Sequence, residues 1–235
     1  MMNLLPVGIS VIASALLLLN ASLIATSNVD RGPLPRELVL ARLWTPDDKP
    51  LVQYRALRHM TASTRGGRMS ASMDAWTSLD EAGRFSFEIV SESGSSLIRQ
   101  RVLRAALTAE QESQSPGARE QAALTIANYE FLQMRPDSEH LLKIDIKPRR
   151  KHVMLVDGAL FVEEETADLV RIEGELTKRP SFWTRRVRVV REYKRIDGVH
   201  VPVAMSSTAD VLVVGTSTFS MTYDYLEINR KAVSK

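Results

Sequence analysis

Residues 52–75 read VQYRALRHMTASTRGGRMSASMDA, and this stretch decides the fold. Apolar side chains recur at every second position in each half, a period that is typical of strands with one buried face. Between the halves lies the turn RGGR at residues 65–68, where glycine takes positive φ without steric strain. The alternating apolar residues are Val52, Tyr54, Ala56, Met60 and Ala62, then Met69, Ala71, Met73 and Ala75. The stretch therefore predicts a β-hairpin.

A third alternating segment and then a change of period follow this hairpin. Phe85, Phe87 and Ile89 continue the period of two, so an antiparallel meander of three strands is predicted. Helical spacing then takes over in two segments, and we expect the second helix to end at Pro136. The helical positions are Ile98, Val102, Ala106 and Ala109, then Ala123, Ala127, Phe131 and Met134.

Beyond the helices the period of two returns up to residue 225. The six segments are 142–146, 153–155, 170–176, 187–193, 199–213 and 219–225. Turns are expected at Asp157-Gly158, Asp197-Gly198 and Gly215. About nine strands with one apolar face each are satisfied by one sheet wrapped around helices. We predict an α+β fold: a single curved antiparallel sheet, a half-barrel, with the helical insertion packed on its concave face.

Composition excludes several classes of protein. The chain has 235 residues, a net charge of +3 and no cysteine, so disulfide scaffolds, thiolate metal sites and cysteine nucleophiles are ruled out. The mild basic excess comes with no nucleic-acid reading motif, and we expect no nucleic-acid partner.

The chain opens with an apolar segment, residues 4–25, followed by small residues up to Ser27. Its length approaches the roughly 20 residues that cross a bilayer. We divide the chain into residues 1–27, a signal peptide or membrane anchor, and 28–235, one sheet domain. The start carries no Lys or Arg, and Arg31, Arg36 and Arg42 follow the segment. Three arrangements remain open: a cleaved signal, which we favour, and an uncleaved anchor with the domain outside or inside. The favoured location is periplasmic or extracytoplasmic.

This layout resembles the lipoprotein-carrier group typified by LolA and LolB. The resemblance covers most of residues 35–228, and the segment from Arg179 through Phe182 and Trp183 to Asp197-Gly198 and Pro202 is similar to uncharacterised exported bacterial proteins of that kind. It implies a half-barrel whose concave face holds acyl chains, and it assigns no catalytic residue.

Two groups of residues are candidate sites. Aromatic side chains could line an apolar ligand cavity or form plain core: Trp76, Phe85, Phe87, Phe182, Trp183, Phe219 and Tyr223. Arg186, Arg188 and Lys194 share one face of a strand, either as a solvated outer face or as a contact with anionic lipid headgroups or an acidic partner.

No catalytic, cofactor or metal site is predicted. The four histidines are scattered, without the close spacing of metal ligands, and the nucleophile elbow, the P-loop and the dinucleotide fingerprint are missing from the sequence. We expect a non-catalytic exported protein that encloses a lipid or acyl chain between sheet and helices. The alternative is an envelope-associated structural or interaction module that docks a membrane surface or envelope protein through its basic strand.

Overall fold

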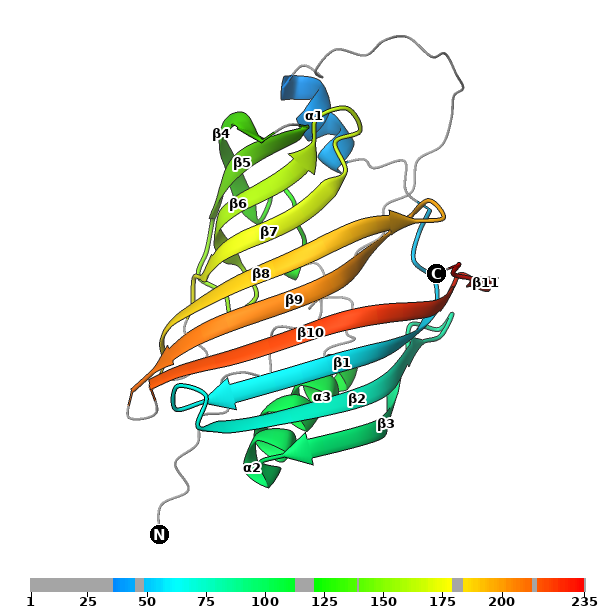
Figure 1. Cartoon of the computed structure of the whole chain (residues 1–235). Coiled ribbons are helices and arrows are strands. Elements are labelled where there is room, and N and C mark those ends of the chain that lie inside the picture. The colour runs from blue at the N-terminus through cyan, green and yellow to red at the C-terminus, as the bar shows by residue number, and fades with distance from the viewer. Residues whose placement is uncertain are drawn as a thin grey trace.

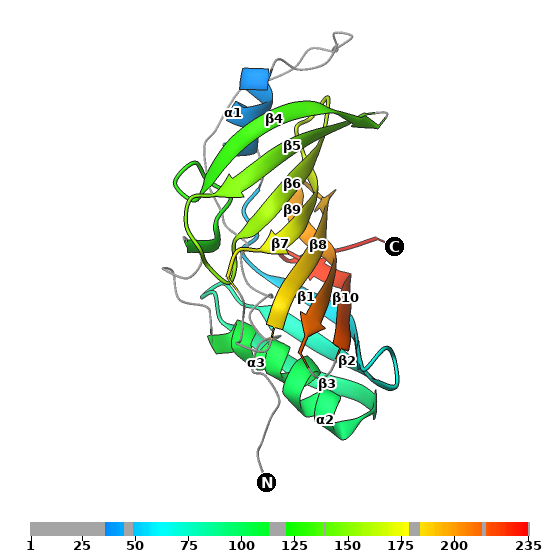
Figure 2. The same ribbon diagram turned by 90° about the vertical axis from the view of Figure 1, so that its left-hand side faces the viewer.

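The computed structural model describes residues 36–44, 49–112, 121–138, 140–178, 184–212 and 215–234. Within these ranges the strands form one open, curved antiparallel sheet, and the helices lie on one side of it (Figures 1 and 2). The predicted fold class is confirmed. Residues 1–27 lie outside the described residues, so the signal peptide or membrane anchor stays a prediction. Phe182 and Trp183 also lie outside them, so their place in the predicted cavity stays a prediction.

The sheet contains eleven strands among the described residues. They are β1 (Tyr54–Thr64), β2 (Met69–Leu79), β3 (Phe85–Gly94), β4 (Tyr129–Ser138), β5 (Leu141–Pro148), β6 (Val156–Glu163), β7 (Leu169–Leu176), β8 (Thr184–Ile196), β9 (Val199–Val211), β10 (Gly215–Ile228) and β11 (Lys231–Ala232). Their order is β3-β2-β1-β10-β9-β8-β7-β6-β5-β4, with β11 paired to β10. The chain thus builds two meanders, which the β1–β10 pairing joins into one sheet.

The helical segments are α1 (Arg36–Trp44), α2 (Ser96–Ile98), the π-helix η1 (Arg99–Arg104) and α3 (Ala105–Glu112). Helix α1 packs with Val39 in an apolar cluster that β4, β5 and β6 also enter. The continuous run α2, η1 and α3, here called the helical cover, packs against the concave side of β1, β2 and β3 (Figure 2). Among the described residues, no helix is long and apolar enough to cross a membrane.

The two faces of the sheet differ in chemistry because side chains alternate along each strand. Met60 and Met73 are buried on the concave face beneath the helical cover. On the convex face hydroxyl groups pair across strands, as Thr61 does with Ser220 at 2.7 Å. The apolar alternation of the sequence therefore marks the concave face.

The strand expected at residues 153–155 is part of the β5–β6 turn, and β6 begins at Val156. Two further expectations from the sequence are wrong in detail. Residues 129–138, read as the end of a second helix, form strand β4. A bulge puts Phe131 opposite Ile146 and Met134 opposite Ile144, so two apolar neighbours on one strand face are three residues apart and imitate helical spacing.

The second error is the turn expected at Asp157-Gly158, which lies inside β6. Gly158 faces Gly174 of β7 across the pairing. A Cβ on Gly158 would lie 2.0 Å from the Glu173 carbonyl oxygen, so glycine is needed here for the close approach of two backbones. The dipeptide marks a point of close strand contact.

We predict that Gly158→Ala lowers the free energy of unfolding by about 3 kcal/mol, because β6 and β7 must separate to admit the methyl group. Urea unfolding measures the effect. The matched control is Gly67→Ala, at a turn glycine with φ +88° and no atom near the added Cβ, where we expect about 1 kcal/mol. Equal losses at the two positions would contradict this explanation of Gly158.

Candidate functional site

A buried ion pair joins the concave face of the sheet to the helical cover. Arg58 of β1 is 1% exposed. Its Nη1 donates to Glu110 Oε2 of α3 at 2.5 Å, and its Nη2 donates to Oε1 at 2.9 Å. This two-pronged geometry fits the planar guanidinium to the carboxylate and fixes the orientation of both groups. It is a polar link between sheet and cover inside an apolar surround.

Aromatic side chains enclose the Arg58 guanidinium. Arg58 Nη2 also donates to the Tyr54 hydroxyl at 2.8 Å. Its Cζ lies 5.0 Å from the centre of the Phe85 ring and 4.6 Å from that of Tyr223, within the range of cation–π attraction. Arg58 Nε has no hydrogen-bond acceptor in the described part of the chain. Arg58 Nη1 also lies 3.8 Å from Met221 Sδ. The cation is therefore held by one carboxylate, one hydroxyl, one thioether sulfur and two ring faces.

Burial and the ion pair shift the pKa values of this cluster. Burial raises the pKa of the Tyr54 hydroxyl to about 12, partly offset by Arg58 beside it. Burial likewise raises the pKa of Tyr223 and of Tyr225. Burial acts to lower the pKa of Arg58, but Glu110, together with Tyr223 and Tyr54, raises that pKa above its ordinary value. At neutral pH the cluster contains a charged arginine and uncharged tyrosines.

A π-helical turn sets which side chains of the helical cover point toward the sheet. Ile98 and Leu103 are both buried although they are five residues apart, because residues 99–104 wind as a π-helix with wider turns than an α-helix. Leu107 and Glu110 then follow at α-helical steps on the buried side. The periodicity expected from Ile98 through Val102 thus changes by one residue, and this change points Glu110 toward Arg58.

Sequence reasoning missed the ion pair, although one signal was present. Arg58 falls on the same strand parity as Ala56 and Met60, so a charge occupies a core position. Such a residue is seldom fully buried without a partner. Glu110 gave no comparable signal, because its burial depends on the π-helical turn.

A second ion pair fixes the cover from outside. Glu92 of β3 accepts from Arg99 Nη1 at 2.5 Å and from Arg104 Nη2 at 3.1 Å. Both arginines belong to η1, and the carboxylate is part-exposed. Exposed ion pairs contribute little to stability. We therefore assign the defined position of the cover chiefly to the buried pair.

Four of the residues predicted to line an apolar cavity lie on the concave side. Phe85 and Phe219 are buried in the cluster that also contains the cover, and Phe87 and Tyr223 are partly buried against it. They pack against helical side chains such as Leu103. They form a covered apolar face, and the ligand cavity stays a prediction.

Trp76 lies elsewhere, and its place among the lining residues is corrected. Its neighbours along β2, Ala75 and Thr77, are buried, so Trp76 points to the convex face. There Arg55 lies with its Cζ 4.9 Å from the ring centre. The polar parity of Trp76 in the sequence already indicated this outer position.

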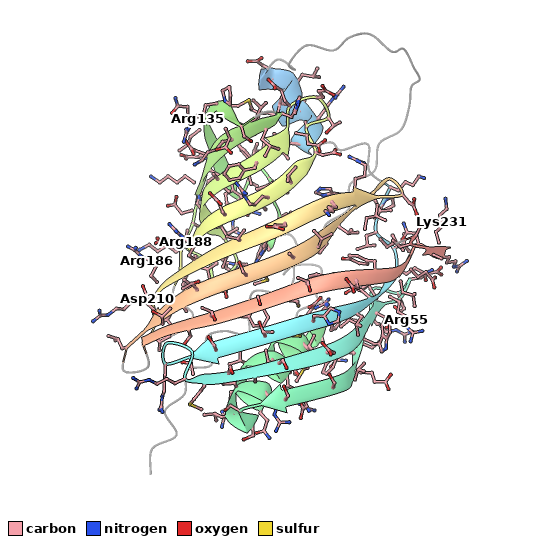
Figure 3. All side chains as sticks on the ribbon, in the orientation of Figure 1. Arg55, Arg135, Arg186, Arg188, Asp210 and Lys231 are labelled. Carbon is pink, nitrogen blue, oxygen red and sulfur yellow. The ribbon has the colours of Figure 1, made fainter. Side chains whose placement is uncertain are left out.

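The three basic residues singled out on β8 are exposed. Arg186 forms an ion pair with Glu175 at 3.2 Å and lies opposite Asp210 of β9, while Arg188 lies opposite Glu175. Figure 3 shows Arg186, Arg188 and Asp210 together at one end of their strands. Lys194 lies further along β8. The positive charge of Arg186 and Arg188 is therefore partly neutralised by the acidic side chains Glu175 and Asp210 on the neighbouring strands.

Titratable groups also meet on the convex face, around His59. Its Nδ1 lies 2.8 Å from Asp74 Oδ1, and its Nε2 lies 3.4 Å from Asp224 Oδ2. The hydrogen bond with Asp74 raises the pKa of His59. Within the described ranges, no group of three or more His, Asp or Glu side chains is positioned to hold a metal ion. We interpret this cluster as a cross-strand contact.

Comparisons with known proteins bear on the fold. No protein-family model matches the sequence, and no curated protein matches it. Two solved structures align with most of the chain. A DUF1329 family protein from Desulfovibrio piger is 11% identical, with 80% of this chain and 89% of that chain covered and a TM-score of 0.39. A LolA superfamily protein from Nitrosomonas europaea is 10% identical, with 86% and 96% covered and a TM-score of 0.38.

The second of these structures belongs to the group that the sequence layout resembles. This similarity does not say what this chain binds.

We predict that Glu110→Ala lowers the free energy of unfolding by about 3–5 kcal/mol, because it leaves the Arg58 charge buried without its carboxylate. The matched variant is Arg58→Met with Glu110→Leu, in which apolar side chains replace both charges and stability stays within about 1 kcal/mol of the parent. Chemical denaturation measures both. A double variant as unstable as Glu110→Ala would contradict this explanation. It would show that the loss comes from the missing ion pair and not from the unpaired Arg58 charge.

Proposed function

We propose that the chain is a non-catalytic binding protein for an apolar ligand, a lipid or acyl chain, which lies against the concave face of the sheet when the helical cover moves away. The Arg58–Glu110 pair carries the proposal. The cover meets an apolar face through this buried link. The other contacts in the cluster are those of apolar side chains, which a hydrocarbon chain can replace.

Stability alone does not account for a buried ion pair. Replacing such a pair with apolar residues of similar volume is often neutral or stabilising, whereas apolar contacts are non-directional. The pair gives the cover one defined closed position. When the cover leaves, Arg58 and Glu110 regain water together, so opening exposes the apolar face without leaving an unpaired buried charge.

An acyl chain would cover the apolar concave face once the helical cover has moved away. Each buried methylene contributes about 0.8 kcal/mol, and the face presents flexible methionine side chains, Met60, Met73 and Met221, that adapt to an irregular ligand. Phe85 and Phe219 border them in the same cluster. This chemistry favours a hydrocarbon over a polar ligand.

We predict that Glu110→Ala raises the apparent affinity for a fluorescent C16 fatty acid at least tenfold, because it destabilises the closed cover and increases the binding-competent fraction. The Arg58→Met, Glu110→Leu variant keeps the cover closed and binds no better than the parent. Fluorescence titration measures both.

The control is Asp145→Ala, which removes the ion pair with Arg135 on β5 and β4, at the opposite edge of the sheet from the helical cover, and should leave binding unchanged. The proposal fails if no variant takes up the fatty acid and an organic extract of the purified chain contains no lipid by mass spectrometry.

We further propose that the domain acts outside the cytoplasm. The support is the apolar segment at residues 4–25 with its small-residue end, as in export signals. After expression in a bacterial host, we expect the recovered chain to begin near Asn28, and its intact mass measures this start. A chain that keeps Met1 and stays in the cytosolic fraction would contradict export.

A further inference from the structure

Charge is divided between the two ends of the sheet. In an antiparallel sheet successive turns alternate between ends. At one end lie the turns β1–β2 (65–68), β5–β6 (149–155), β7–β8 and β9–β10, which we call the basic end. Their described residues carry six basic side chains and no acidic one: Arg65, Arg68, Arg149, Arg150, Lys151 and Lys178.

The opposite end has the reverse composition. Its turns are β2–β3 (80–84), β4–β5, β6–β7 (164–168), β8–β9 and β10–β11. The described residues in them carry six acidic side chains and two basic ones: Asp80, Glu81, Glu164, Glu165, Asp168 and Asp197, with Arg84 and Arg230. The mild net charge of the chain therefore hides a strong asymmetry along the strands.

Register shows that the basic turns lie at a common level. Thr64 contacts Ser217, which pairs with Ala209, which in turn pairs with Val187. One step further out, Arg65 lies at the level of Arg186. The strands between the β1–β2 and β5–β6 turns place these turns about 24 Å apart along the sheet, at about 4.8 Å per strand. Figure 2 looks onto this end.

Several of these charges have no internal role. Arg65, Arg68, Lys151 and Lys178 are exposed and form no ion pair within the described part of the chain. Arg149 and Arg150 instead fix the β5–β6 loop, as in the hydrogen bond from Arg149 Nε to the Ile126 carbonyl oxygen.

An exposed apolar side chain accompanies the basic end. Helix α2 begins there, because the Ser95 amide donates to the Ser70 carbonyl oxygen at 2.8 Å. Leu97, in its first turn, is 39% exposed. Cations at a common level with an apolar side chain beside them match the boundary between lipid headgroups and acyl chains.

We propose that the basic end docks the protein on an anionic membrane surface through lipid phosphate groups. Charges at the tips of separate turns form a broad footprint, which suits an extended surface better than the continuous groove of a nucleic-acid binder. The acidic turns then face away from the membrane. This docking surface does not depend on ligand binding beneath the helical cover.

The test is sedimentation of the full chain with vesicles of phosphatidylcholine alone or with 30% phosphatidylglycerol. The apolar residues 4–25 contribute equally to binding of the two kinds of vesicle. The readout is the ratio of the two partition coefficients. At about fivefold per basic residue near the surface, Arg65→Glu with Arg68→Glu lowers this ratio about 25-fold or more. The Lys151→Glu, Lys178→Glu variant, in other turns of the same end, does the same.

The control is Arg230→Glu with Lys231→Glu, an equal change of net charge at the opposite end, where Figure 3 shows Lys231. It should lower the ratio less than threefold, and 500 mM salt should bring the ratio for the parent close to one. An equal loss in the control, or no loss in either basic-end variant, overturns the proposal. A salt-sensitive oligomer also overturns it if the basic-end reversals dissolve that oligomer, the Arg230→Glu, Lys231→Glu control keeps it, and the partition ratio stays constant. The basic end then docks on the acidic end of a second copy.

Discussion

The contact between Arg58 and Glu110 is the interaction on which the arrangement of sheet and cover depends. An open sheet with an apolar concave face must cover that face, and apolar packing alone allows a helix to slide across it. The bidentate pair, with Tyr54 and two aromatic rings around it, permits one position. A buried charge is tolerated only with its partner, so the same contact that fixes the cover also makes its displacement a defined step.

The sheet assigns different chemistry to each of its surfaces. The concave face is apolar and covered, and the convex face carries paired hydroxyl groups such as Thr61 with Ser220. The strand ends are separated by charge, basic at one end and acidic at the other. The proposed ligand face and the turns of the proposed docking surface use different residues, and the two surfaces meet at α2, where Leu97 of the helical cover lies at the basic end.

Much of the fold could be predicted from alternation, because one face of each strand is buried and the period of two survives in the sequence. Prediction failed where backbone geometry changes the period. The bulge between Phe131 and Met134 imitated a helix, and the dipeptide Asp157-Gly158, whose glycine pairs with Gly174, imitated a turn. The π-helical turn between Ile98 and Leu103 likewise concealed the orientation of Glu110, so half of the central ion pair had no signal in the sequence.

The sequence predicted the positions of four aromatic residues, and their role in lining a ligand cavity stays a prediction. Phe85, Phe87, Phe219 and Tyr223 lie on the covered face as their parity indicated, while Trp76 lies on the outer face. The charge asymmetry could not be found by scanning for basic runs, because it emerges only when turns distant in sequence are brought to one end by the antiparallel topology.

Native-state hydrogen exchange of the full chain, with and without a bound C16 fatty acid, tests most directly whether the cover opens as a unit. Residues 99–112 should exchange through a partial opening whose free energy lies below that of β1 and β2, and the fatty acid should increase exchange of the cover while protecting the sheet. If residues 99–112 exchange only with global unfolding, at the same free energy as β1, and the fatty acid changes neither, the cover is a fixed part of the core and the account is contradicted.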